Sequence, residues 1–239
     1  MSAPVAVTVP TVDGPMPAHL WVPAGGRGPG LVLLQEIFGV SDYIRDRAGD
    51  LAELGYTVLA PEIYWRLDGT VDESREDFMD QAMALVGRLD WDTAVADGVA
   101  ALRTLRERPE TSGPVGVVGF CFGGGLAFSV AAADAPDVLV SYYGSALPNL
   151  LGLADQVAAP SIHHFGTDDS YIPLETVLNI REVVGGPEVE FHLHDGAGHA
   201  FDNPRPEFHH AEASAAAWQQ TTAFLTRRLP VPGGPSAHS

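Results

Sequence analysis

The sequence contains no lysine and only one cysteine, Cys121. Without lysine, the chain cannot form an internal Schiff base with pyridoxal phosphate or supply the lysine of a phosphate-binding loop. A single thiol excludes an intrachain disulfide and any metal site built from several thiolates. The zinc-binding pattern H-E-x-x-H is also missing. Two large enzyme classes are thereby excluded, and we expect no metal site.

Positive charge is scarce as well. The chain has 13 basic residues, all of them arginine, against 31 acidic ones, which gives a formal net charge of −18. The arginines are scattered along the sequence, so a phosphate backbone or an anionic lipid surface would be repelled. We expect neither nucleic acid nor a membrane as a partner.

Long apolar runs are missing too. No stretch approaches the 18 consecutive apolar residues of a membrane-spanning helix. The opening residues, MSAPVAVTVPTVDG, lack the basic and apolar regions of a secretory signal, so we expect a cytoplasmic protein. A length of 239 residues with 46% hydrophobic residues suits one domain, which we place at 1–229, followed by a frayed tail at 230–239. The sequence leaves open whether the protein is a monomer or a small homo-oligomer.

Short apolar and β-branched runs alternate with segments of helical periodicity. Helices are indicated at 41–55 and on both sides of Gly87 within 74–107. Strands that alternate with helices form a mostly parallel sheet with helices on both faces. Functional residues then gather in loops at the carboxyl ends of the strands. The eight expected strands are 5–9, 18–22, 30–35, 56–61, 115–120, 138–144, 161–166 and 189–195.

The cysteine lies in the segment VVGFCFGGGLAF, between an apolar strand and a helical run. Gly119, Cys121 and Gly123 form the G-x-C-x-G pattern of a nucleophile elbow, a sharp turn that holds the nucleophile in a strained conformation. A thiol at a helix N-terminus is also favoured in its reactive thiolate form. The alternative is a buried cysteine that only fills space. The spacing and the strand-to-helix context favour a nucleophile.

An elbow nucleophile requires a base and an acid, in the chain order nucleophile, acid, histidine. His199 lies in the glycine-bounded loop GAGHAF just after the last expected strand, and we expect it to be the base. Asp168 and Asp169 follow the preceding strand. The residues alone do not decide which of the two is the acid. The remaining histidines fall mainly within strands or side by side at 209–210, where packing or surface roles are expected.

Glu36 directly follows an inner strand, in LLQEIFG. In this architecture the loop after that strand borders the nucleophile, so its amide groups and the amide of Phe122 are candidates for an oxyanion hole. We expect Glu36 to lie near Cys121. A carboxylate there would disfavour the thiolate, so it would hold the resting thiol neutral or accept its proton.

The chain resembles the dienelactone hydrolase family of α/β-hydrolases. The resemblance runs over nearly the whole sequence, through the motifs LQEIFGV, GYTVLAPEIY, VGVVGFCFGGGLAF, FGTDDSYIP and GHAFDNPRPEFHHAEASAAAWQQTTAFL. It implies the α/β-hydrolase fold and a triad of Cys121 as nucleophile, His199 as base and Asp169 as acid, because Asp169 lies four residues before Pro173. It also implies that no cofactor is needed.

The resemblance assigns further roles near the nucleophile. Glu36 would control the ionisation of the thiol, and the amides of Ile37 and Phe122 would bind the oxyanion. Members of the family open enol-lactones such as 4-carboxymethylenebut-2-en-4-olide, which gives maleylacetate in the breakdown of chlorinated aromatic compounds.

The founding type of enzyme in this family holds the carboxylate of its substrate with arginines. One of these lies four residues after the catalytic histidine, where this chain has Asn203. Arg205 is close by in sequence, and Arg75 lies in a region that resembles that of the other anchor. These two arginines are the candidates for substrate binding here.

Three functions are compatible with these patterns. The first is a cysteine-dependent hydrolase of lactones or small carboxylic esters. The second is a general esterase or thioesterase for small acyl substrates. The third belongs to another class, a catalytically retired α/β-hydrolase that binds a small ligand or a protein, because a fold does not imply its chemistry. The complete set of Cys121, Asp169 and His199 favours the first.

Overall fold

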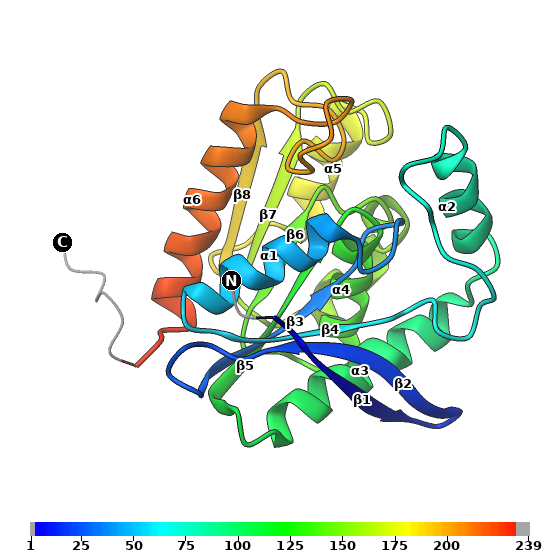
Figure 1. Ribbon diagram of the computed structural model, residues 1–239. Coiled ribbons are helices and arrows are strands. Elements are labelled where there is room, and N and C mark those ends of the chain that lie inside the picture. Colours follow the sequence, from blue (N-terminus) through cyan, green and yellow to red (C-terminus); the bar gives the residue numbers. More distant parts are fainter. Residues whose placement is uncertain (1–2, 233–239) are drawn as a thin grey trace.

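The computed structural model describes residues 3–232, and its centre is one eight-stranded sheet with the strand order β1-β2-β4-β3-β5-β6-β7-β8 (Figure 1). The pairs from β4 through β8 are parallel, whereas β1 and β2 form an antiparallel hairpin and β2 runs antiparallel to β4. The predicted, mostly parallel sheet is thus confirmed. The strands are β1 (Val5–Thr11), β2 (Gly14–Trp21), β3 (Gly28–Leu34), β4 (Thr57–Pro61), β5 (Thr111–Phe120), β6 (Leu139–Tyr142), β7 (Ser161–Gly166) and β8 (Val189–His194).

Helices cover both faces of the sheet, as expected. Helices α1 and α6 lie on the near face in Figure 1, α1 against β2 and β4 and α6 against β7 and β8. On the other face, α3 and α4 pack against each other and against the central strands β3 and β5. The helices are α1 (Asp42–Glu53), α2 (Phe78–Val86), α3 (Trp91–Glu107), α4 (Phe122–Ala133), α5 (Leu174–Val184) and α6 (Ala211–Arg228), with short 3₁₀ turns η1 (Leu147–Asn149) and η2 (Leu151–Gln156).

The central strands are covered by helices on both faces. Every residue of β3, β4, β6 and β7 is buried. Continuous apolar runs are typical of parallel strands between two helical layers. Helix α2 differs, since only Ala82 and Leu85 are buried in it, and it stands apart from the helical layers in Figure 1.

Parallel strands bring distant segments to one edge of the sheet. The segments that follow β3, β5, β7 and β8 contain Glu36, Cys121, Asp169 and His199, respectively. Because these four strands run in the same direction, their carboxyl ends meet at the same edge. The fold therefore gathers these side chains although they are far apart in sequence.

The expected tail at 230–239 lies mostly outside the described residues, which end at residue 232. Its first part makes contacts, since Val231 packs against the core. Val231 also lies so close to Gly55 that a Cβ there would be 2.7 Å from it. No helix within residues 3–232 is long and apolar enough to cross a membrane.

Candidate active site

Cys121 occupies the turn between β5 and α4. Its φ of 53° and ψ of −115° place it in a backbone conformation that L-residues rarely adopt, and it is the N-cap of α4. Strain of this kind persists only where the surrounding structure enforces it. The turn directs the sulfur to the carboxyl edge of the sheet, next to the positive end of the helix dipole.

The glycines of the G-x-C-x-G pattern are required sterically. A Cβ on Gly119 would overlap the carbonyl oxygen of Gly123, and a Cβ on Gly123 would overlap the carbonyl oxygens of Leu34 and Gln35. Both clashes involve backbone atoms, which cannot rotate away. The spacing thus lets the turn close tightly against β3 and keeps Cys121 at its apex.

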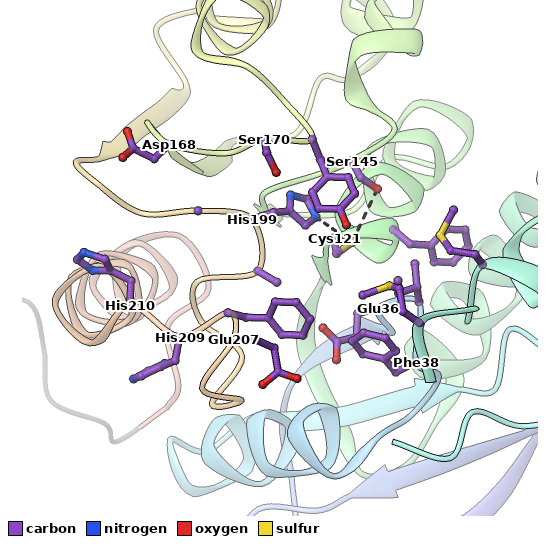
Figure 2. A pocket seen from close by; sticks show the side chains of 18 of the residues that line it. Glu36, Phe38, Cys121, Ser145, Asp168, Ser170, His199, Glu207, His209 and His210 are labelled. Atoms are coloured by element: carbon purple, nitrogen blue, oxygen red, sulfur yellow. Dashed lines mark hydrogen bonds between the residues drawn. The ribbon is translucent and has the colours of Figure 1, made fainter. Parts of the chain in front are cut away.

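The structure brings Cys121, His199 and Asp169 together. The Nε2 atom of His199 lies 3.1 Å from Cys121 Sγ, and its Nδ1 atom lies 2.7 Å from Asp169 Oδ2 (Figure 2 shows the Cys121–His199 contact). The other carboxylate oxygen of Asp169 accepts hydrogen bonds from the amides of Tyr171 and Ile172, at 2.8 and 2.9 Å. These amides fix the carboxylate so that it faces the ring.

Asp168 is oriented differently. It lines the same pocket, but its carboxylate accepts only a long hydrogen bond of 3.4 Å from the Thr167 hydroxyl, and its side chain points away from His199 in Figure 2. Its backbone amide donates to the carbonyl of Ala197 in the neighbouring loop. Of the two adjacent acids, Asp169 is the one in contact with the imidazole.

The charges of this trio stabilise a protonated ring. Burial by itself would lower the pKa of His199, but the negative charge of Cys121 and the hydrogen bond to Asp169 outweigh it and raise the pKa to about 10. The ring of His199 is therefore protonated at neutral pH and lies 3.1 Å from the sulfur of Cys121.

Backbone strain is concentrated at this site. Within residues 3–232, the non-glycine residues with positive φ are Cys121, Tyr143 and Ala200. Ala200 directly follows His199 in the chain. The Tyr143 ring packs edge-on against His199, with 5.4 Å between ring centroids, and against Phe201. The contact with Tyr143 adds a packing partner to the imidazole beside its two polar ones.

Asp202 anchors the loop that carries His199. Its fully buried carboxylate accepts hydrogen bonds from the Tyr43 hydroxyl at 2.6 Å, from Arg47 at 2.7 and 2.8 Å and from the Ser214 hydroxyl at 2.7 Å. Tyr43 also contacts the hydroxyl of Tyr143, at 3.2 Å. Sequence reasoning missed this network, since its members are spread over three distant segments and no local pattern marks them.

Glu36 is buried and lines the pocket, but its polar partner is not the thiol. Its Oε1 atom accepts a hydrogen bond of 2.9 Å from the side-chain amide of Asn203. Burial raises the pKa of Glu36 to about 8, against the opposing effect of that hydrogen bond. The carboxyl is thus mostly neutral at pH 7. Asn203 stands where the founding type of enzyme in the family has an arginine, and here its side-chain amide binds Glu36.

The residues expected to form the oxyanion hole border the same pocket. Ile37 and Phe122 both line it, together with Cys121. Phe122 is the first residue of α4, where a backbone N–H has no acceptor within the helix. The Ser145 hydroxyl, which sequence reasoning did not single out, lies 3.9 Å from Cys121 Sγ.

The pocket has a volume of about 760 Å³ and opens beside Cys121 (Figure 2). Arg75 and Arg205 are not among the residues that line it. Arg75 is exposed and pairs with Asp77, and Arg205 binds Glu73 and Glu207. The described residues contain no cluster of three or more histidine, cysteine, aspartate or glutamate side chains suited to hold a metal ion.

Comparisons with known proteins identify the family of the chain. The model of the dienelactone hydrolase family matches residues 16–229. A carboxymethylenebutenolidase from Pseudomonas putida is 36% identical over 206 residues, covering 85% of this chain and 87% of the relative. A carboxymethylenebutenolidase from Rhodococcus opacus is 34% identical over 220 residues, covering 86% and 84%.

Solved structures show the same fold. The crystal structure of a dienelactone hydrolase-type protein from Klebsiella pneumoniae superposes with a TM-score of 0.81 at 26% sequence identity, covering 94% of this chain and 98% of that one. The α/β-hydrolase fold expected from the sequence is thereby confirmed. On the strength of the family match and of relatives above 30% identity, this chain belongs to the dienelactone hydrolase family.

Proposed function

We propose that this protein is a cysteine-dependent hydrolase of lactones or small carboxylic esters, with Cys121 as nucleophile, His199 as acid–base residue and Asp169 as its orienting acid. The observation that supports the proposal most directly is the chain of short contacts from sulfur to imidazole to carboxylate, 3.1 and 2.7 Å long. Nucleophile, base and orienting group within hydrogen-bond reach are the signature of covalent catalysis.

The first half of the reaction forms a thioester. The Cys121 thiolate attacks the carbonyl carbon, and the carbonyl oxygen becomes an oxyanion that accepts hydrogen bonds from the amides of Ile37 and Phe122. When this intermediate collapses, the bond between the acyl carbon and the leaving oxygen breaks. That oxygen takes the proton from His199 Nε2. In a lactone the leaving oxygen stays tethered to the acyl group, because both belong to one ring.

The second half releases the acid. Neutral His199 removes a proton from a water molecule, which attacks the thioester carbon. Collapse of the second tetrahedral intermediate breaks the carbon–sulfur bond, releases the carboxylic acid and restores the thiolate beside a protonated imidazole. The Asp169 carboxylate accepts the hydrogen bond from Nδ1 and so keeps that nitrogen protonated, with Nε2 facing the sulfur.

Glu36 contributes by staying neutral. An ionised carboxylate in this pocket would repel the thiolate, but with a pKa near 8 the Glu36 carboxyl carries little charge at pH 7. Its ionisation at higher pH would bring a second negative charge into the pocket. In this way Glu36 would control the thiolate of Cys121 through its own protonation state.

The proposal is tested by comparing the wild type with Cys121→Ala on a neutral lactone, dihydrocoumarin, and on p-nitrophenyl acetate. Loss of the nucleophile should lower kcat/KM by about 1,000-fold or more for both substrates. Undiminished turnover by Cys121→Ala would refute a cysteine nucleophile. A clear preference for the open ester over the lactone would favour a general esterase or thioesterase.

A retired enzyme is distinguished by alkylation. We expect iodoacetamide to modify Cys121 faster than a free cysteine at pH 7, and we expect His199→Ala to abolish this advantage. A thiol that reacts no faster than free cysteine, together with no turnover of either substrate, would indicate a ligand-binding protein instead.

A further inference from the structure

The pocket offers little that would bind a substrate with a carboxylate, since such a substrate requires positive charge or hydrogen-bond donors. Besides the catalytic groups, the pocket is lined by the acidic residues Asp168 and Glu207 and by a broad apolar wall. That wall consists of Ile37, Phe38, Met79, Met83, Val86, Phe122, Tyr171, Ala200 and Phe208. A substrate anion entering here would lose its hydration against apolar groups and meet negative charge.

Positive charge near the pocket is already neutralised. The Arg205 guanidinium lies over the Phe78 ring and forms an ion pair with Glu207 at 2.7 Å. It also lies 3.6 Å from the Glu73 carboxylate and donates a hydrogen bond of 3.0 Å to the Glu73 carbonyl. One cation therefore faces two carboxyl groups. Arg75 is held by Asp77 at 2.7 Å on the exposed surface. All three nitrogens of the Arg205 guanidinium thus contact Glu73 or Glu207, and neither arginine lines the pocket.

The two neighbouring histidines do not replace these arginines. His210 is the N-cap of α6 and accepts a hydrogen bond from the Ala213 amide through Nδ1, which requires that nitrogen to be unprotonated. In Figure 2 the rings of His209 and His210 both point away from Cys121. The ring of His199 already has two partners, Cys121 Sγ and the Asp169 carboxylate.

Part of the apolar wall, in contrast, is open to solvent. Met79, Met83 and Val86 recur at helical spacing on α2 and face the pocket, and Met83 remains 54% exposed. Tyr171, 68% exposed, stands next to His199 with 5.1 Å between ring centroids. Methionine side chains adapt to apolar groups of varied shape. A volume of about 760 Å³ lies within the range of pockets that hold drug-sized ligands.

We propose that this hydrolase prefers neutral esters or lactones with an extended apolar group, which the wall of α2, Phe38 and Phe208 receives, over substrates that carry a carboxylate. This inference rests on the proposed function and narrows its substrate class. The relatives named carboxymethylenebutenolidase are named for a lactone with a carboxylate-bearing substituent. The preference would thus distinguish this chain from the enzymes it resembles.

A matched pair of substrates tests the preference. The p-nitrophenyl ester of hexanoic acid and the mono-p-nitrophenyl ester of adipic acid share the leaving group and the six-carbon acyl chain, and differ in ending on a methyl or a carboxylate. After subtraction of spontaneous hydrolysis, we expect kcat/KM at pH 7.5 to be about tenfold or more higher for the hexanoate. Equal rates, or a preference for the adipate, would overturn the inference.

A charge introduced at the apolar wall should change the preference. Met83→Arg places a guanidinium on an exposed position of α2, and we expect it to reduce the ratio of hexanoate to adipate turnover by about fivefold or more. The control is Leu54→Arg, which adds the same charge at the far end of α1, outside the pocket. It should leave the ratio unchanged within about twofold.

The outcomes separate this inference from the proposed function. Cysteine-dependent turnover with a preference for the adipate would retain the hydrolase and refute the neutral substrate class. A ratio that Met83→Arg does not change would likewise refute the role of the α2 wall. Turnover of neither ester by the wild type would overturn both.

Discussion

Removal of the Asp202 carboxylate tests whether the buried network positions the His199 loop. Asp202→Ala deletes the acceptor of four hydrogen bonds, from Tyr43, Arg47 and Ser214, at a site without solvent access. It leaves Arg47, whose side chain is 16% exposed, without its main counterion. Breaking a buried ion pair by removing one partner costs about 3–5 kcal/mol.

The lower end of that range is expected here. Arg47 keeps a hydrogen bond of 3.0 Å to Asp50 and its position over the Trp218 ring. A loss of about 3 kcal/mol corresponds to a decrease of about 6–12 °C in Tm for a protein of this size. Because Asp202 lies three residues after His199, we also expect kcat to fall, since displacing a catalytic group by 1 Å can cost about 100-fold.

Thermal unfolding and steady-state kinetics of the same preparations provide the assay. Arg75→Ala is the control, because it removes only an exposed ion pair and should leave the Tm nearly unchanged. The double variant Arg47→Ala/Asp202→Ala should be less destabilised than the sum of the two single changes. A loss below 1 kcal/mol for Asp202→Ala, or strict additivity in the double variant, would refute the reasoning.

Two further substitutions test the elbow and the buried glutamate. Gly123→Ala should lower the free energy of unfolding by about 3 kcal/mol and abolish most of the activity, because its Cβ would overlap two backbone oxygens. Gly152→Ala is the control and should be neutral, because its Cβ would meet no atom within 4 Å. Thermal melts of the two variants that coincide by circular dichroism would contradict this. For Glu36, the folded state retains a proton up to about pH 8 that the unfolded chain loses near pH 4.5, so wild-type stability should decline across this interval. Glu36→Gln should make that decline smaller, because it removes the contribution of Glu36. Parallel stability curves of the two proteins from pH 5 to 9 would argue against a raised pKa of Glu36.

The strands of the sheet and the position of Cys121 at a turn from strand to helix could be predicted because their signals are local. The apolar run before Cys121, the flanking glycines and the helical run after it all lie within twelve residues. The loops with Asp169 and His199 follow two strands whose apolar character is equally local. Parallel strands then bring these loops to one edge of the sheet without any further information.

Contacts between distant segments could not be predicted in this way. From the residues alone, Asp168 and Asp169 were equivalent, and the two amides that orient Asp169 become apparent only in the folded loop. Glu36 was expected near the thiol, but its hydrogen bond goes to Asn203, 167 positions away in sequence. The two arginines considered for substrate binding form ion pairs with acidic residues nearby in the chain, and the sequence does not show that these ion pairs form.

The central claim is that the sulfur of Cys121 forms a covalent bond with the acyl group during turnover. Acid quenching of the reaction with p-nitrophenyl hexanoate within the first turnovers, followed by peptide mass spectrometry, measures this directly. We expect the peptide that contains Cys121 to gain the mass of one hexanoyl group, and no adduct to form in Cys121→Ala. A hexanoyl group on another residue, or full turnover by Cys121→Ala without any adduct, would contradict the claim.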